Sequence, residues 1–194
     1  MSKVLLVSHF SQKAVRLYKT TLLTKTNQIG MFMPARGISE KSEVSYNVWK
    51  ELVKSNGDEL IQLDNSTIIN EEEKTIFEKA AYLIVPGGNT YILLDNIKRN
   101  GYFNEIQSFL NTDNKTYLGM SAGAIITTDI SISRDENEPN LEDLAALGYL
   151  NHTIIAHYEK DSDSRDPSKY NNSLILSNDG FAIFQNKDLV EHVI

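Results

Sequence analysis

A short run around Ser121 has the residue types that serine hydrolases use for nucleophilic attack. The run Gly119-Met120-Ser121-Ala122-Gly123 follows an apolar segment and spells Gly-x-Ser-x-Gly, the pattern of a nucleophile elbow between a strand and a helix. A serine in such a turn has a strained backbone, so the residues two before and two after it must lack bulk. The pattern predicts a nucleophilic serine, and the alternative is an ordinary strand-to-helix turn capped by a serine.

Residues 86–90, with the sequence Pro-Gly-Gly-Asn-Thr, form a second glycine-rich turn after an apolar run. A serine nucleophile needs N–H donors for the oxyanion, and bare glycine backbone can approach a substrate carbonyl closely. Gly88 N–H and Ala122 N–H are the predicted donors, because one lies in this turn and the other begins the helix after the serine. The alternatives are a plain helix start capped by Asn89 or Thr90, or a weak phosphate-binding nest.

The general base must be one of four histidines, which are His9, His152, His157 and His192. It should lie at the carboxyl end of a strand beside the serine, and an acid should orient its other ring nitrogen. His157 follows the apolar run Thr153–Ala156, and His9 is not rejected because it follows the first strand. We predict His157 as the base and Asp179, which follows another apolar run and precedes Gly180, as the acid.

Other assignments of the acid and the base stay open. Asp179-Gly180 is also an ordinary pair for a β-hairpin turn, and Glu191 beside His192 is a fallback acid. In α/β-hydrolases the chain order is Ser, acid, His, which would take the acid from residues 129–143 and the base from His192. A chain of 194 residues is small for that fold.

The elements that must position these residues alternate between short apolar runs and amphipathic stretches. The predicted strands are Lys3–Val7, Ile29–Met33, Glu59–Leu63, Tyr82–Val85, Tyr117–Met120, Thr153–Ala156, Leu174–Leu176 and Phe181–Phe184. The predicted helices are Gln12–Leu23, Ser39–Lys54, Glu71–Ala81, Tyr91–Arg99 and Phe103–Leu110. This alternation indicates one domain over residues 1–194, an α/β fold of three αβα layers with a mostly parallel central sheet. Ligands bind beyond the carboxyl ends of such strands, so the two glycine-rich turns should face one crevice.

Composition excludes several classes of function. The chain has no cysteine, which excludes a thiolate nucleophile, disulfides and zinc–thiolate sites. A net charge of −7 with scattered basic residues argues against nucleic acid as a partner. No apolar run approaches membrane-spanning length, and the N-terminal residues enter a strand. We therefore expect a cytoplasmic protein that acts without a cofactor, metal ion or membrane partner.

Three segments together resemble peptidase E, the aspartyl dipeptidase family of serine peptidases that also includes cyanophycinases. They are residues 85–94, 119–124 and 156–158. The resemblance covers nearly the whole chain, and Gly-Gly-Asn-Thr upstream of Gly-x-Ser-Ala-Gly is far more specific than either motif alone. It implies a flavodoxin-like fold similar to class I glutamine amidotransferases, with serine in place of their cysteine, and cleavage of dipeptides with aspartate at the amino end.

Transferred position by position, the resemblance assigns a role to each candidate residue. Ser121 would be the nucleophile, His157 the base, and Gly88 and Ala122 the oxyanion donors. The family's acid is a glutamate before a glycine, and this chain has Asp179 there, one methylene shorter.

Substrate recognition needs a cation, because a buried carboxylate without one is unfavourable. The family has an arginine after the histidine at the spacing that Arg165 occupies here, and a bidentate arginine would select an aspartate side chain. Arg165 has acidic neighbours, so local pairing in a solvated loop is the alternative. We expect Asn89 and Arg165 to bind a small peptide. A non-catalytic binding domain and a cyanophycinase-like enzyme for β-linked aspartyl peptides are the alternative functions.

Overall fold

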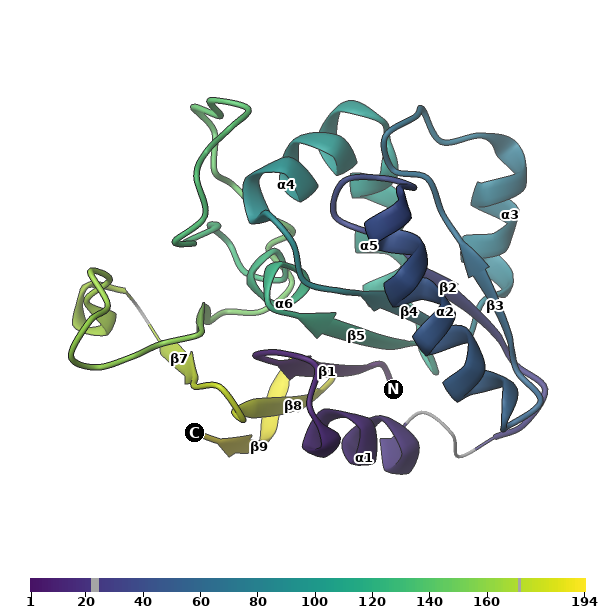
Figure 1. The fold of residues 1–194 in the computed structure, drawn as a ribbon, viewed down its shortest axis with the longest axis horizontal. Coiled ribbons are helices and arrows are strands. Elements are labelled where there is room, and N and C mark those ends of the chain that lie inside the picture. Colours follow the sequence, from purple (N-terminus) through teal and green to yellow (C-terminus); the bar gives the residue numbers. More distant parts are fainter. Residues whose placement is uncertain (22–24, 171) are drawn as a thin grey trace.

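The computed structural model describes residues 1–21, 25–170 and 172–194, and it shows a sheet covered by helices (Figure 1). Its strands are β1 (Lys3–Val7), β2 (Ile29–Phe32), β3 (Glu59–Gln62), β4 (Tyr82–Val85), β5 (Thr116–Met120), β6 (Thr153–Ala156), β7 (Ser173–Leu176), β8 (Phe181–Gln185) and β9 (Asp188–Val193). Its helices are α1 (Gln12–Thr21), α2 (Glu40–Lys54), α3 (Glu71–Lys79), α4 (Thr90–Arg99), α5 (Tyr102–Leu110) and α6 (Ala122–Ile125), with a 3₁₀ turn at Pro167–Lys169. The expected end of the first helix, at Leu23, lies outside the described residues.

Seven strands in the described part of the chain form one sheet in the order β3-β2-β4-β5-β1-β8-β9. The first five run parallel, and β8 and β9 add an antiparallel edge, which confirms the mostly parallel sheet. The register sets Val7 of β1 opposite Met120 of β5, and Val85 of β4 opposite Gly119. The residues that follow these three strands therefore emerge at one edge of the sheet.

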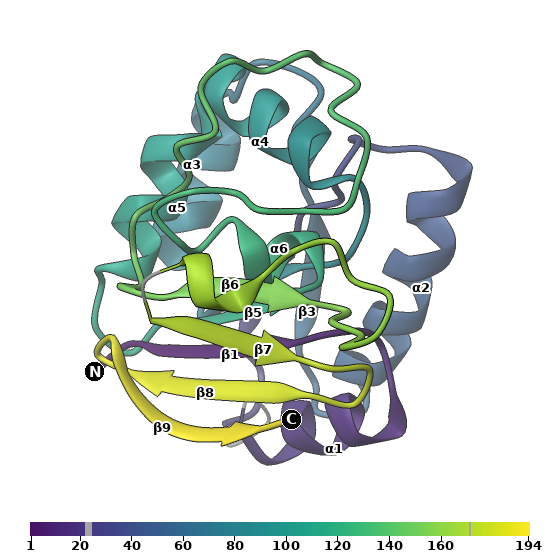
Figure 2. The same ribbon diagram turned by 90° about the vertical axis from the view of Figure 1, so that its left-hand side faces the viewer.

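Alternate residues of the buried strands pack against opposite helical layers, as the two-residue period of a strand requires. In β1, Leu5 and Val7 join the core formed with Tyr18 of α1 and Trp49 of α2. The intervening residues of β1 join the core that includes α3, α4, α5 and α6. Figure 2 shows α2 on one side of the sheet and α3 and α5 on the other. The three-layer αβα arrangement follows from this packing.

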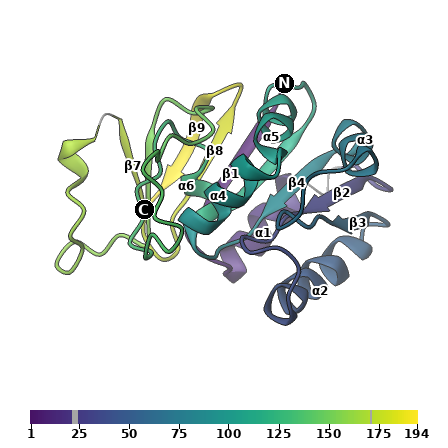
Figure 3. The same cartoon turned by 90° about the horizontal axis from the view of Figure 1, so that it is seen from above.

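The strands β6 and β7 pair in parallel as a separate two-stranded sheet. Figure 3 shows β7 at the opposite end of the molecule from β2 and β3. The sequence predicts both strands but does not show that they leave the main sheet. Because β7 and β8 belong to different sheets, Asp179-Gly180 connects two sheets and does not close a hairpin.

The connection between α6 and β6 runs over residues 126–152 without a helix or a named strand, and it carries one isolated bridge between Ile130 and Ala145. It passes close to α4, where the side chains of Ser133 and Asp135 accept hydrogen bonds from Thr90 at the start of that helix. Among the helices of the described residues, none combines the length and apolar character needed to cross a membrane.

Candidate active site

Ser121 lies between β5 and α6 in the strained backbone of a nucleophile elbow, with φ 50° and ψ −109°. A positive φ is uncommon for residues other than glycine. A Cβ atom on Gly119 would lie 2.5 Å from the Gly123 carbonyl oxygen, and one on Gly123 would lie 2.1 Å from the Val85 carbonyl oxygen. Side chains cannot fit at either position, which gives the Gly-x-Ser-x-Gly pattern its physical reason.

His157 follows β6 directly, and its imidazole meets the serine. The distance from His157 Nε2 to Ser121 Oγ is 2.8 Å. The pKa of the imidazole is lowered from its ordinary value, first by burial, which disfavours the charged form, and then by the positive charge of nearby His9. The lowered pKa keeps His157 neutral near pH 7, the state in which it can accept the serine proton.

The other ring nitrogen of His157 meets Ser8, the buried residue after β1. Ser8 Oγ lies 3.1 Å from His157 Nδ1, and the same oxygen accepts the backbone N–H of His157 at 3.1 Å. A proton on Nδ1 would point at Ser8 and leave the Nε2 lone pair facing Ser121, which is the tautomer that a general base needs. The sequence analysis missed Ser8, although Ser8 also follows β1, which is the position that made His9 a candidate.

Asp179, the predicted acid, is exposed in the turn after β7. Among the described residues no hydrogen bond joins Asp179 to His157. The sheet arrangement explains this, because the chain enters β8 at once and the Gly180 carbonyl accepts the N–H of Ser8 at 3.1 Å. The backbone of this turn therefore reaches the site, whereas Asp179 is exposed to solvent.

The histidines of the alternative assignments take other places. His192 lies in β9, and its Nε2 is 2.7 Å from the Ile175 carbonyl oxygen. Glu191 is exposed on the same edge strand. The ring centroid of His9 is 6.4 Å from that of His157, so His9 borders the site, but the imidazole that meets the serine belongs to His157.

Two backbone amides beside the serine are available for an oxyanion. In the part of the chain that the structure describes, neither Gly88 N–H nor Ala122 N–H has a hydrogen-bond acceptor. A Cβ atom on Gly87 would lie 3.3 Å from the Ser121 Cβ, so the glycine-rich turn packs directly against the nucleophile. This arrangement matches the crevice expected between the two turns.

Asn89 caps α4, as the structural alternative expects. Its Oδ1 accepts the N–H groups of Tyr91 and Ile92 at 3.0 Å each, and its Nδ2 donates to the Glu136 carbonyl oxygen at 2.8 Å. Both polar atoms of the side chain are thus engaged within the protein, and the predicted contact with substrate would have to compete with them.

Two neighbouring residues of the irregular connection tie the glycine-rich turn and the base together. Asp135 Oδ2 accepts the N–H and the hydroxyl of Thr90, each at 2.7 Å. Arg134 Nη2 donates to the His157 carbonyl oxygen at 2.8 Å. The sequence analysis missed both residues, because no periodic pattern marks their segment.

Arg165, the predicted carboxylate receptor, is 7% exposed and bound to the protein itself. Its guanidinium donates to Asp163 through Nε at 2.9 Å and through Nη2, and to the Ala156 carbonyl oxygen at 2.8 Å. The hydrogen bonds from Arg165 to Asp163 are the main cause that lowers the pKa of Asp163 to about 2. The structure therefore shows the local pairing that the sequence offered as an alternative, but with a buried arginine in place of a solvated one.

No group of three or more histidine, aspartate or glutamate side chains in the described residues is placed to hold a metal ion.

Residues 5–189 match the family model of peptidase family S51. The chain belongs to this family. It is 29% identical over 132 residues to an uncharacterized peptidase of Listeria monocytogenes serovar 1/2a, covering 66% of this chain and 64% of the relative. It is 33% identical over 102 residues to an uncharacterized peptidase of Pasteurella multocida, covering 50% and 49%. The alignments span less than two thirds of both relatives.

The S51 chain also shares its fold with solved structures. A candidate peptidase E from Listeria monocytogenes EGD-e superposes with a TM-score of 0.81 at 24% identity over the full length of both chains. A peptidase from an acI-B1 actinobacterium gives a TM-score of 0.68 at 16% identity, covering 95% of this chain and 84% of the other. These likenesses confirm the fold that the peptidase E resemblance implies.

Proposed function

We propose that this S51 chain is a serine-type exopeptidase that hydrolyses short peptides through an acyl-enzyme on Ser121. One observation carries the proposal: the hydroxyl of a strained elbow serine lies 2.8 Å from Nε2 of a partly buried imidazole whose pKa is lowered. That contact is the arrangement of an activated nucleophile and its base. Membership of a peptidase family and the unpaired amides of Gly88 and Ala122 support it.

The first half of the reaction forms the acyl-enzyme. His157 Nε2 takes the Ser121 proton as the hydroxyl attacks the peptide carbonyl. Gly88 N–H and Ala122 N–H stabilise the oxyanion, and a donor of this kind typically contributes about 10²–10³ in rate. Protonated His157 then gives its proton to the leaving amine. In the second half His157 takes a proton from a water molecule as the water attacks the acyl group. Ser121 regains its proton from His157 and the carboxylic acid product is released.

Ser8 takes the place of a carboxylate beside the base in this mechanism. Its neutral oxygen can hold the Nδ1–H tautomer of His157. It stabilises the imidazolium less than a negative charge would. We therefore expect slower turnover than in enzymes whose histidine is paired with an acid.

For the substrate we propose dipeptides with an N-terminal aspartate, cleaved in the cytoplasm. The support is the resemblance to peptidase E across the motifs that surround Ser121 and His157. Selection of aspartate needs a cation near the scissile bond, and the paired Arg165 does not provide a free one.

A screen of Asp-X, Glu-X and Ala-X dipeptides with the wild type and Ser121→Ala tests the function. We expect hydrolysis by the wild type and a loss of about 10⁶ in kcat in the variant, as for removal of a serine nucleophile in subtilisin. A fluorophosphonate probe should label Ser121. Cleavage that persists unchanged in Ser121→Ala would contradict the proposal. A folded wild type that neither hydrolyses nor is labelled would indicate a binding domain instead.

A further inference from the structure

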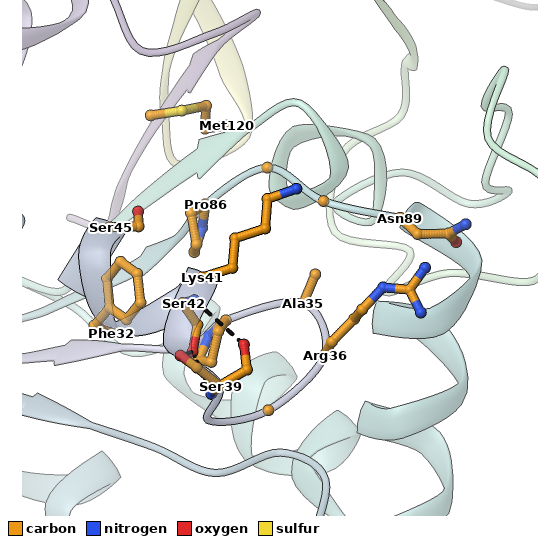
Figure 4. A pocket seen from close by; sticks show the side chains of 14 residues that line it. Phe32, Ala35, Arg36, Ser39, Lys41, Ser42, Ser45, Pro86, Asn89 and Met120 are labelled. Carbon is orange, nitrogen blue, oxygen red and sulfur yellow. Dashed lines mark hydrogen bonds between the residues drawn. The ribbon is translucent and has the colours of Figure 1, made fainter.

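A pocket of about 430 Å³ opens beside the nucleophile, between the β2–α2 connection and the β4–α4 turn (Figure 4). Its lining includes Gly87, Gly88 and Met120, the residue that precedes Ser121. Since a Cβ on Gly87 would lie 3.3 Å from the Ser121 Cβ, the pocket adjoins the predicted acylation site. A substrate bound at Ser121 can place one of its groups in this pocket.

The pocket is positively charged in a chain whose net charge is −7. Of the fourteen described residues that line it, Arg36 and Lys41 are basic and none is acidic. The Arg36 guanidinium is already bound by Glu138, with Nη1 donating to Oε2 at 3.1 Å and Nη2 donating to Oε1. The pKa of Glu138 is lowered first by this hydrogen bond. The charge of Arg36 is therefore largely compensated within the protein.

Lys41 is exposed and, among the described residues, makes no ion pair or hydrogen bond. Figure 4 shows its side chain extending across the pocket, with the amino group toward the segment between Pro86 and Asn89. That segment carries the amide of Gly88. Lys41, the cation of this pocket that has no partner among the described residues, thus faces the turn where the scissile carbonyl should lie.

The position of Lys41 is unfavourable for the fold alone. It occupies the first turn of α2, where the partial positive charge of the helix disfavours a cation. Its neighbours Glu40 and Glu43 have the charge that suits this helix end. The lysine is therefore not explained by a contribution to this helix end.

We propose that Lys41 binds a carboxylate of the substrate in this pocket and is the residue that selects anionic short peptides, in place of Arg165. The inference rests on the proposed peptidase function. The ammonium group has three donors on a flexible stem, so it can meet a carboxylate that enters beside Gly88. That carboxylate belongs either to the side chain of the first residue or to the C-terminus of the peptide.

Three substrates separate the two sources: aspartyl-alanine, asparaginyl-alanine and aspartyl-alanine amide. With a hydrogen bond to a charged group lost, Lys41→Gln should lower kcat/KM roughly 10-fold or more on any substrate that keeps the contacted carboxylate. If Lys41 binds the side chain, the preference for aspartyl-alanine over asparaginyl-alanine collapses. If it binds the C-terminus, the preference for the free acid over the amide collapses. Lys41→Arg should retain part of the preference.

Lys54→Gln is the matched control, because it removes the same charge from the last turn of the same helix. It should leave all three rates unchanged. Unchanged preferences in Lys41→Gln, together with hydrolysis that depends on Ser121, would overturn the inference and leave the proposed function intact. Hydrolysis that does not depend on Ser121, or none by the wild type, would overturn both.

Discussion

The two sides of Ser121 both carry basic and hydroxyl groups, but they use them differently. On the side of the base, Arg165 is bound by Asp163, and Ser8 is bound to His157. On the side of the pocket, Lys41 and the Gly88 amide have no partners among the described residues. The base side of the site is thus closed at Arg165, Ser8 and His157, although His9 Nδ1 has no partner among the described residues. The pocket side, where Arg36 is bound by Glu138, offers the Lys41 ammonium and the Gly88 amide.

This difference separates positioning from recognition. A side chain fixed by several internal hydrogen bonds can hold a neighbouring group within the narrow geometry that proton transfer requires. It is not free to bind a ligand, because its donors would have to leave existing acceptors. An exposed cation has lost less hydration and keeps its donors for a substrate. Arg165 fits the first role and Lys41 the second.

The largest expected effect is a loss of stability caused by a substitution on the base side of Ser121. In Arg165→Gln the carboxylate of Asp163, whose side chain is fully buried, loses its closer cation and keeps only Arg134, whose Nη1 is 4.0 Å from Oδ2. Breaking a buried ion pair by removing one member costs about 3–5 kcal/mol, so the free energy of unfolding in urea should fall by that order. Lys41→Gln should leave the urea midpoint unchanged or raise it slightly.

The double variant Arg165→Gln/Asp163→Asn controls this prediction, because it also removes the carboxylate charge of Asp163 that the single variant leaves without Arg165. It should recover part of the lost stability. If Arg165→Gln were as stable as the wild type but lost the preference for acidic peptides, Arg165 would be the substrate's receptor and the contrast between the two sides would fail.

A smaller effect concerns the group that orients His157. Ser8→Ala removes one neutral hydrogen bond from the imidazole, which should lower kcat/KM roughly 10-fold. Asp179→Asn, its control, should change kcat/KM less than twofold by the same scale, since Asp179 is exposed and without a hydrogen bond to His157. Both rates should be measured on one dipeptide across pH. The reverse result would restore Asp179 as the acid and leave Ser8 a packing residue.

Most of the fold could be predicted from the sequence because it depends on local patterns. The apolar runs give β1, β4 and β6 with the same bounds that the structure shows, and β2, β3, β5, β7 and β8 to within one residue at either end. No bounds were predicted for β9. The separation of β6 and β7 from the main sheet could not be predicted. Strand pairing is a long-range property, and a buried strand of either sheet has the same apolar pattern.

The candidate site also has a part that could be predicted from the sequence and a part that could not. Ser121 and His157 follow strands whose carboxyl ends could be recognised, so their meeting could be expected, and their catalytic roles stay predictions. Charge pairing could not be read from the sequence. Arg165 has acidic residues on both sides of it, and only the structure shows that Asp163 binds its guanidinium. No motif surrounds Lys41, so it could be identified as a candidate binding residue only from the pocket that it lines.

The smallest expected effect is a shift in the pH dependence of kcat/KM caused by a substitution beside His157. The pKa of His157 is lowered mainly by burial and then by the charge of His9, and neutral His157 is the active form. The acid limb of kcat/KM should therefore have its midpoint below pH 6.5, the ordinary pKa of histidine. In His9→Gln the positive neighbour is gone, so the pKa of His157 rises and the limb moves to higher pH.

His152→Gln is the control for this shift, because His152 packs on Phe184 with a ring-centroid distance of 5.2 Å and does not contribute to the pKa of His157. Its acid limb should coincide with that of the wild type. A limb that stays in place in His9→Gln would mean that burial and the charges of Arg134 and Arg165 set the pKa of the base without His9. A limb that moves to lower pH would mean that His9, 6.4 Å from His157 between ring centroids, stabilises the protonated base by accepting a hydrogen bond through water. The direction of the shift thus tells whether the closed side acts on the base through charge or through hydrogen bonding.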